Sequence, residues 1–563
     1  MTSEAPRHAS SSALRKKPKR SSALRLNWLS TISTLQVLAV GLIVALFLLV
    51  YGPFLFEYRT GLIRPDTTTY FRLGQEFMAG TIDTTLRTPG FPVLLYLFTK
   101  SFSQFAFVVL QSLVYLSSVL FLYMSLTRQY GFWMVGPALA ASCLMILSTL
   151  ALRYNVTLLT ESLFMSGCLL YVAYLIFRMN NMRSIDVLLL SFLSVLLFLL
   201  RNSGLIFLAV NLALVAFSVE LLKRPIRNVG LALVPLLAVV VLININNYVS
   251  AGLFRTTILS SGNVEPVLWQ PSVEFPEPVN ELLRSLMPDT HRGDLKRLKE
   301  TWDLKEIAAI GRQYSKEIEP EDNLVTLLTN PKGHNIRMDI VTNDGPTEVR
   351  PQARYLMDII NANAIKKNRL LFYKLWVANL YSYCCLHFSH YNRWEEDFLG
   401  PALAAKVRFR EKQSTNEELA RSLLDPSQDE AAMKFVLTSP DGKWATNPAN
   451  VVNRHVLRNM QFAKYVEMNS IWGYWALIVG GLSVFGLLLS RLRNKNLYVV
   501  AVPATIYGAY MFGFVFNGAL YEVRAMVPMT PLNYFLCIVG SSIILREAYM
   551  AFGVYKQSRP KAE

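Results

Sequence analysis

The sequence predicts an α-helical, multi-span integral membrane protein of about ten transmembrane helices, with a large extracytoplasmic insert of mixed α/β or mostly helical structure. Three observations predict this class. The 563 residues are 52% hydrophobic and have a mean hydropathy of +0.31, which is too apolar for a soluble protein of this length. Apolar runs of about 20 residues, the length that crosses a bilayer core, recur along the chain. Lys and Arg residues gather between these runs, as the positive-inside rule expects.

The high positive charge is explained by this topology. The formal net charge is +17 and the pI is about 9.5, a balance that in a soluble protein would indicate a nucleic-acid partner. Here the basic residues lie between apolar runs, and no zinc-ribbon, RRM or helix-turn-helix pattern is present. We therefore expect no nucleic-acid partner.

The chain begins with a basic tail. Residues 1–28 are rich in Ser, Lys and Arg, which predicts a disordered segment on the cytoplasmic side. The apolar run 29–56 that follows is long enough to span a membrane and shows no small-residue cleavage site. We therefore interpret this run as a first span rather than as a signal peptide.

Ten spans follow from the apolar runs. They lie at 30–55, 103–126, 132–151, 158–177, 185–200, 204–222, 229–249, 471–490, 497–516 and 528–548. The predicted domains are the tail 1–28, a transmembrane module 29–249 with an outer loop 56–102, the insert 250–470, the C-terminal transmembrane helices 471–549 and a cytoplasmic tail 550–563. No internal repeat is visible, which disfavours the inverted-repeat transporter folds.

The orientation follows from the basic residues. With the N-terminus inside, every short loop on the cytoplasmic side contains Lys or Arg, as does the C-terminal tail. These residues are Arg128, Arg178, Arg183, Lys223, Arg224, Arg227, Arg491, Arg493, Lys495, Lys556, Arg559 and Lys561. Both termini are then cytoplasmic. The outer loop, the insert and the turns at 152–160, 201–203 and 517–527 lie outside.

One segment of the insert has two interpretations. Residues 370–390 are aromatic and moderately apolar, which fits an interfacial or buried helix and also an eleventh span. We favour the interfacial or buried helix, because an additional span would invert the well-supported loops that follow it.

Polar and ionisable residues concentrate at the predicted outer ends of the spans. Such groups are costly at membrane depth and are usually functional or paired. The richest stretch is 57–92, which holds Asp66, Tyr70 and the cluster Arg87-Thr88-Pro89-Gly90-Phe91-Pro92. The others are Glu161 beside Thr160, Arg201 beside Asn202, and Tyr521, Glu522 and Arg524 before Pro528.

These residue types fit a transfer reaction on a lipid phosphate. An Arg guanidinium can bind two phosphate oxygens at once. A carboxylate such as that of Asp66 can accept the proton of an attacking hydroxyl. Tyr70 suits a membrane interface, and its ring can stack on a sugar.

Each candidate also has a purely structural interpretation. Asp66 could be the N-cap of the helix that follows it, and Arg87 could be an interfacial anchor that snorkels to lipid phosphates. Glu161 could simply pair with Arg201 between neighbouring helices. Glu522 and Arg524 could form an ordinary loop ion pair.

The sequence favours no metal or nucleotide site. The cluster Cys384-Cys385-Leu386-His387-Phe388-Ser389-His390 contains metal-binding residue types, but it lacks the spaced CxxC pattern of structural zinc sites. No P-loop, dinucleotide fingerprint or nucleophile elbow is present. A divalent metal ion as cofactor stays open.

The outer motifs resemble those of GT-C membrane glycosyltransferases, and above all the branch of the protein O-mannosyltransferases and the lipid A aminoarabinose transferase. In that branch an acidic residue follows the first span, and a basic residue beside Pro precedes the second long one, as Asp66 and Arg87 do here. Thr160-Glu161-Ser162-Leu163 resembles the opening of the fourth span, and Tyr521-Glu522-Val523-Arg524 resembles a motif before a late span. The resemblance covers 30–249 well, 471–548 moderately, and the insert not at all.

The resemblance implies a glycosyltransferase of a bacterial inner or plasma membrane with an extracytoplasmic active site. Its donor would be a polyprenyl-phosphate sugar, its acceptor a glycan, lipid or protein, and transfer would invert the anomeric carbon. By analogy the general base is Asp66, the donor phosphate is held by Arg87, Arg201 and Arg524, and the cavity is lined by Tyr70, Glu161, Tyr521 and Glu522. The chain lacks the tandem Asp-Glu pair of the mannosyltransferases, because Thr67 follows Asp66. The acceptor class therefore stays open.

Two other functions are alternatives. A transporter or flippase of lipid-linked glycans should show polar residues at span centres and matched broken helices. Here Asn244, Asn246 and Asn247 lie near the end of the seventh predicted span, and few polar residues lie at mid-depth. A ligase that uses a diphosphate-linked donor would need several Arg side chains at one cavity, which Arg201 and Arg524 could supply.

Overall fold

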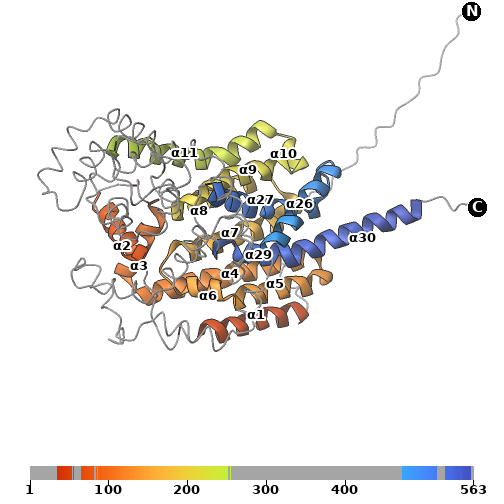
Figure 1. Cartoon of the computed structure of the whole chain (residues 1–563), viewed down its shortest axis with the longest axis horizontal. Helices are drawn as coiled ribbons and strands as arrows, with labels where there is room; N and C mark the ends of the chain where they lie inside the picture. The colour runs from red at the N-terminus through yellow and green to blue at the C-terminus, as the bar shows by residue number, and fades with distance from the viewer. Residues whose placement is uncertain are drawn as a thin grey trace, which may run out of the picture.

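A computed structural model describes the transmembrane part of the chain (Figure 1). The described residues are 34–52, 55, 65–80, 84, 87–251, 254, 256, 472–516 and 527–558. Their regular elements are all helices, as predicted. The basic tail 1–28, nearly all of the insert including 370–390, and the residues Tyr521, Glu522 and Arg524 lie outside the described ranges.

The described residues form a series of helices. In chain order they are α1 (Thr34–Gly52), α2 (Pro65–Met78), α3 (Gly90–Ser101), α4 (Gln104–Tyr130), η3 (Phe132–Met134), α5 (Val135–Leu147), α6 (Thr149–Asn155), α7 (Thr160–Arg178), η4 (Met179–Asn181), α8 (Ser184–Leu200), η5 (Asn202–Ile206), α9 (Phe207–Ala216), α10 (Val219–Leu222), α11 (Pro225–Ala251), α26 (Trp472–Leu489), α27 (Lys495–Phe516), η8 (Val527–Met529), α29 (Thr530–Tyr534), η9 (Phe535–Gly540, a π-helix) and α30 (Ser541–Ser558).

Several of these segments are suited to a membrane. Five are long and apolar enough to cross a bilayer, namely Thr34–Gly52, Phe105–Tyr130, Thr160–Asn181, Pro225–Val249 and Thr530–Phe552. Four shorter apolar segments accompany them, at Phe132–Leu147, Ser184–Leu200, Asn202–Ala216 and Gly473–Leu489. The protein therefore has the make-up of a multi-pass membrane protein. Each of the ten predicted spans overlaps a helix, and the number of actual crossings stays a prediction.

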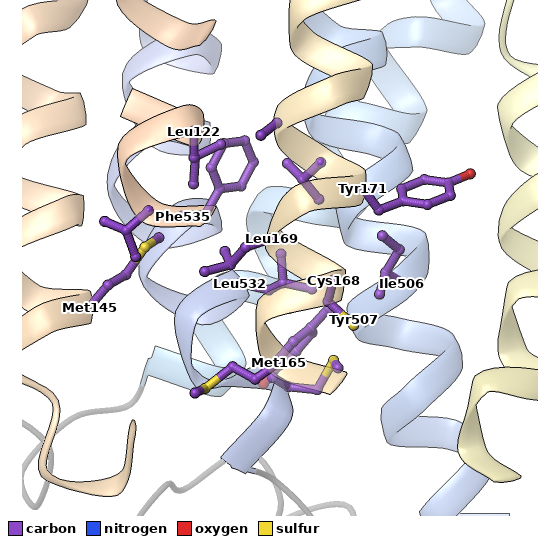
Figure 2. Packing of buried hydrophobic residues seen from close by; sticks show 14 of the residues in the cluster. Leu122, Met145, Met165, Cys168, Leu169, Tyr171, Ile506, Tyr507, Leu532 and Phe535 are labelled. Carbon is purple, nitrogen blue, oxygen red and sulfur yellow. The ribbon is translucent and has the colours of Figure 1, made fainter. Parts of the chain in front are cut away.

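Helix α7 is the centre of the bundle. The span that it begins is 78% buried, against 22% for the span of α11. Figure 2 shows side chains of α7, including Met165 and Leu169, packed among residues of the surrounding helices such as Leu122 of α4 and Phe535 of η9. A buried central helix can hold polar residues away from lipid, which matters for the site at its N-terminus.

Helix α11 lies at the edge of the bundle and faces lipid with one side. Its exposed positions Val234, Val241, Leu242, Ile245 and Val249 are all apolar. In a soluble protein such a stripe would be unfavourable, whereas acyl chains solvate it without cost. The exposed stripe therefore fits a membrane-embedded surface.

Helices α2 and α3 are different, because both are too short to cross a bilayer. They pack closely against each other at one end of the molecule (Figure 1). A Cβ atom at Gly74 of α2 would overlap the carbonyl oxygen of Pro92 in α3, so only glycine permits this approach. Part of the polar outer loop is thus folded into a tight helical pair.

The opposite end of the bundle carries basic residues predicted to be cytoplasmic. The Arg178 Nε lies 2.8 Å from Asp186 Oδ1 between α7 and α8, and the guanidinium of Arg128 lies 4.8 Å from the centre of the Phe177 ring. The C-terminal ends of α4 and α7 therefore lie at the same end of the bundle, so the two helices run parallel. Figure 1 shows α30 extending away from α2 and α3.

Candidate functional site

A buried ion pair joins the start of α7 to the end of α8. The Arg201 Nη1 lies 2.9 Å from Glu161 Oε1, and the Glu161 side chain is fully buried, while that of Arg201 is 16% exposed. Thr160 Oγ1 donates to Glu161 Oε2 at 3.2 Å and accepts from Arg201 Nη1 at 3.5 Å. The pair that the structural interpretation of Glu161 and Arg201 describes is therefore present, and it lies at the predicted outer end.

The local backbone explains how Arg201 reaches α7. Helix α8 ends at Leu200, and Arg201 is extended with φ −155° and ψ 133°. The chain then folds back on the end of α8, where a Cβ at Gly204 would lie 2.5 Å from the Phe198 Cα. Only glycine fits such a sharp return, so Gly204 sets the turn that carries Arg201.

The start of α2 is hydrogen-bonded to the same region. Thr67 is fully buried, and its Oγ1 donates to the carbonyl oxygen of Leu158 at 2.9 Å. Leu158 precedes Glu161 by three residues, and Asp66 precedes Thr67. Because neighbouring Cα atoms are about 3.8 Å apart, the backbone of Asp66 lies close to the N-terminus of α7.

The helix bounds bear on the structural interpretation of Asp66. Helix α2 begins at Pro65, which makes Asp66 the second helical residue rather than the N-cap. Proline is well suited to the first helical position, because its missing N–H has no partner there. An acidic residue in the first turn is favoured by the helix dipole, so the position suits Asp66 without a capping role.

Arg87 is held by an aromatic contact. Its guanidinium carbon lies 5.3 Å from the centre of the Tyr70 ring, at the range of a cation–π interaction. Tyr70 is itself 3% exposed, and its ring meets Phe91 edge-on at 5.0 Å. Arg87 is therefore packed against Tyr70 of the α2–α3 pair.

The segment that follows Arg87 contacts the end of α8, just before Arg201. Gly90 begins α3 three residues after Arg87, and a Cβ there would lie 2.7 Å from the carbonyl oxygen of Leu199. Leu199 is two residues before Arg201. Three features thus meet at one end of α7 and α8. They are the backbone beside Asp66, the segment that follows Arg87, and the Glu161–Arg201 pair.

The remaining predicted residues are outside the described ranges. Tyr521, Glu522 and Arg524 precede η8, which packs against α6 and α7. The cluster from Cys384 to His390 also lies outside. Within the described ranges, no group of three or more His, Cys, Asp or Glu side chains could hold a metal ion.

Sequence reasoning missed two residues of this region. Asn155 donates from Nδ2 to the Tyr51 hydroxyl at 3.0 Å and accepts from the Ser162 hydroxyl, all of them buried. Tyr510 of α27 lies near enough to Glu161 and Arg201 to interact with both electrostatically. Tyr510 comes from the middle of an apolar run, so no local pattern marks it.

A second polar network lies deeper in the bundle, where we expected few polar residues. Asn211 of α9 accepts from the Tyr171 hydroxyl at 2.9 Å and from the Ser194 hydroxyl at 3.3 Å, and its Nδ2 donates to the carbonyl of Ala232 at 2.9 Å. Ala232 lies one turn before Pro235, which cannot donate a helical hydrogen bond. The network therefore joins α7, α8, α9 and α11 near this proline.

Comparisons with models of known families, with curated proteins and with solved structures found no match to this chain. The function proposed for it therefore rests on its residues and their arrangement.

Proposed function

We propose that this protein is a membrane glycosyltransferase that moves a sugar from a polyprenyl-monophosphate carrier to an acceptor on the extracytoplasmic face. The observation that carries this proposal is the buried Glu161–Arg201 pair at the end of the bundle where the α2 start and the Arg87 segment also meet. Ionisable groups at membrane depth are usually functional or paired with one another. The pairing alone would fit a structural role, so it is the position of the pair, next to the other candidate residues, that supports the proposal.

The proposed reaction is a single displacement. The oxygen of an acceptor hydroxyl attacks the anomeric carbon of the donor sugar, and the bond from that carbon to the phosphate oxygen breaks. The polyprenyl phosphate leaves with the electron pair, and the hydroxyl proton passes to the carboxylate of Asp66. Attack opposite to the leaving group inverts the anomeric carbon. Asp66 acts as general base, which requires that it be ionised before the reaction.

The arginines would stabilise the leaving phosphate. A guanidinium can donate two parallel hydrogen bonds to phosphate oxygens, and charge-assisted bonds are about twice as strong as neutral ones. Arg87 is the first candidate, because its stacking on Tyr70 limits the rotamers that it can adopt. Arg201 is oriented by Glu161, and Arg524 is a further candidate from the sequence. Tyr70, Glu161, Tyr521 and Glu522 would complete the cavity.

The fold supports the proposal through the way that basic residues and the candidate site are divided between the two ends of the bundle. The basic residues Arg128 and Arg178 lie at one end of the bundle, and the candidate site lies at the other. By the positive-inside rule, the site end is extracytoplasmic. We propose ten spans in a GT-C-like arrangement in a bacterial inner or plasma membrane, with a glycan, lipid or protein as acceptor.

A donor test would decide the proposal. Purified protein in detergent is mixed in turn with polyprenyl monophosphates that carry different sugars, and thermal stability and release of free polyprenyl phosphate are followed. We expect one donor to stabilise the protein and to be consumed when an acceptor is present. Asp66→Asn keeps the shape of the side chain but removes the base, so this variant should be stabilised by the donor and release nothing.

The matched control is Glu76→Gln, a carboxylate neutralised in the same manner on the same helix. Glu76 Oε1 lies 3.7 Å from Arg72 Nε on the α2 surface. Loss of the Glu76 charge should leave turnover unchanged. Normal turnover by Asp66→Asn would remove Asp66 from the mechanism. Stabilisation and transmembrane movement of the lipid-linked sugar without transfer would identify a flippase, and a response to diphosphate carriers alone would identify a ligase.

A further inference from the structure

Three asparagines lie near the end of α11, a helix that otherwise presents apolar residues to lipid. Asn247 is buried, and Asn244 and Asn246 are partly buried, whereas Ile245 and Val249 are exposed. Asn244 and Asn247 are three residues apart, which places them on one face of the helix. Asn244 and Asn247 therefore turn away from lipid, toward the rest of the protein, while Asn246 lies on an adjoining face.

Thr84 of the outer loop is hydrogen-bonded to the asparagines of α11. The Thr84 hydroxyl donates to Asn247 Oδ1 and accepts from Asn246 Nδ2 at 3.2 Å, and Thr84 is 2% exposed. Arg87 follows Thr84 by three residues. An extended chain covers at most about 3.6 Å per residue, so the Cα atoms of Thr84 and Arg87 are within about 11 Å. The asparagine face is therefore close to the proposed phosphate binder.

The same face lies at the depth of the ion pair. Helices α8 and α11 run in the same direction, because Ser184 bonds to Asn228 at 2.8 Å and Ser191 bonds to Ala232 at 2.9 Å. With a rise of about 1.5 Å per residue, Arg201 lies about 15 Å beyond the level of Ser191, and Asn244 about 18 Å beyond that of Ala232. Asn244 and Arg201 are thus at similar depths on neighbouring helices.

Asn244 has bonding capacity that its surroundings leave unused. Its Oδ1 is buried, and among the residues that the structure describes nothing donates a hydrogen bond to it. Asn246 and Asn247, in contrast, are engaged by Thr84. A buried amide oxygen without a donor is costly, and buried polar atoms of native proteins are usually satisfied. A ligand hydroxyl is a donor of the required kind.

We infer that Asn244 is a specificity-determining residue that accepts a hydrogen bond from a hydroxyl of the donor sugar. The inference rests on the proposed function, and it adds where the sugar lies. The sugar of the donor is bonded to the phosphate, so it must occupy space next to the phosphate-binding arginines. Asn244 lies on the neighbouring helix α11 at the level of Arg201, and the hydrogen bonds of Thr84 to Asn246 and Asn247 hold the end of α11 that carries it.

The test compares two lipids on the full chain in detergent. Binding of bare undecaprenyl monophosphate, and of undecaprenyl monophosphate that carries mannose, glucose, galactose or arabinose, is measured for wild type, Asn244→Ala and Asn228→Ala. We expect Asn244→Ala to reduce the preference for the sugar-bearing lipid about fivefold, as loss of one hydrogen bond would, and to bind the bare lipid as wild type does. Asn244→Ser is a second variant if the alanine variant melts early.

Asn228→Ala is the matched control, since Asn228 is a buried asparagine of the same helix at its other end. It loses bonds to Ser184 and to the Leu221 carbonyl and should keep the full sugar preference. An unchanged preference in Asn244→Ala, or an equal loss of affinity for both lipids, would each overturn the inference while the transferase stands. If wild type binds neither lipid, the proposed function fails first.

Discussion

The hydroxyl of Thr67 in α2 donates a hydrogen bond of 2.9 Å to the carbonyl oxygen of Leu158, just before α7 begins. The two residues are 91 positions apart in the chain, yet this bond sets the residue after Asp66 beside the residues that lead to Glu161. The backbone beside Asp66, the residue proposed as base, is therefore held next to the residues that lead to the Glu161–Arg201 ion pair.

Arg87 offers the most direct prediction. Arg87→Ala should weaken donor binding at least tenfold, because a hydrogen bond to a charged group is worth about 1.5–3 kcal/mol. Arg87→Lys keeps the charge but loses the planar fork and should be intermediate. The measurement is donor titration followed by thermal stability. The control is Lys100→Ala, which removes another cation stacked on a ring of the same helical pair and should have no effect.

The Glu161–Arg201 pair predicts a pattern across three variants. Glu161→Gln leaves a mostly buried guanidinium without its partner and should lower the free energy of unfolding by about 3 kcal/mol, and Arg201→Gln should do at least as much, since Glu161 is fully buried. The double variant should regain part of the stability, because no lone charge remains. Melting in detergent measures the first effect.

Turnover measured on the same three variants separates two roles of the pair. If the ion pair only joins α7 to α8, the double variant should regain turnover together with stability. We expect turnover to stay lost in the double variant, because the proposed cavity needs both groups. A stable and fully active double variant would contradict the role given to Glu161 and Arg201.

Gly74 is predicted to be irreplaceable. Gly74→Ala places a methyl group against the backbone of Pro92 and the Cβ of Tyr96, so α2 and α3 must separate. Overpacking of this kind costs about 1–3 kcal/mol, and the melting temperature and turnover should fall together. Gly230→Ala is the control, because a methyl group at Gly230 of α11 meets no atom within 4 Å. That variant should be neutral or slightly stabilised by its helix propensity.

Asn211 predicts a stability effect without a specific loss of chemistry. Asn211→Leu removes bonds to Tyr171, Ser194 and the Ala232 carbonyl, and interhelical hydrogen bonds in membranes are worth about 0.6–1.7 kcal/mol each. The protein should melt earlier while donor affinity is retained. Thr505→Val loses only a bond to its own helix, at Ala501, and should melt as wild type does. An unchanged melting point in Asn211→Leu would show that the network is dispensable.

Much of the helical pattern could be predicted from the sequence. Hydropathy located a helix over each predicted span, since apolar length is a local property. It could not show that α2 and α3 form a close pair, because the contact depends on two backbones meeting at Gly74 and Pro92. The charges at loop ends predicted that Arg128 and Arg178 share one end of the bundle, and the contacts of both residues agree.

The site was harder to predict than the helices. An ion pair between Glu161 and Arg201 could be proposed from the sequence, because both residues flank predicted spans at the same end. Thr67 and Asn211 could not be selected, because each acts through a partner far along the chain and looks ordinary in its own segment. Asn244 was visible only as a polar residue near a span end, and its unused oxygen is a property of packing.

The last turn of α8 is clasped between two glycines. Gly90 lies on the carbonyl of Leu199, and Gly204 lies on the backbone of Phe198. A turn that is packed against backbone on both sides has little room to move, so Arg201, the residue that follows it, is held in place. In the proposed reaction, each substrate would therefore meet the Arg201 guanidinium on a rigid support.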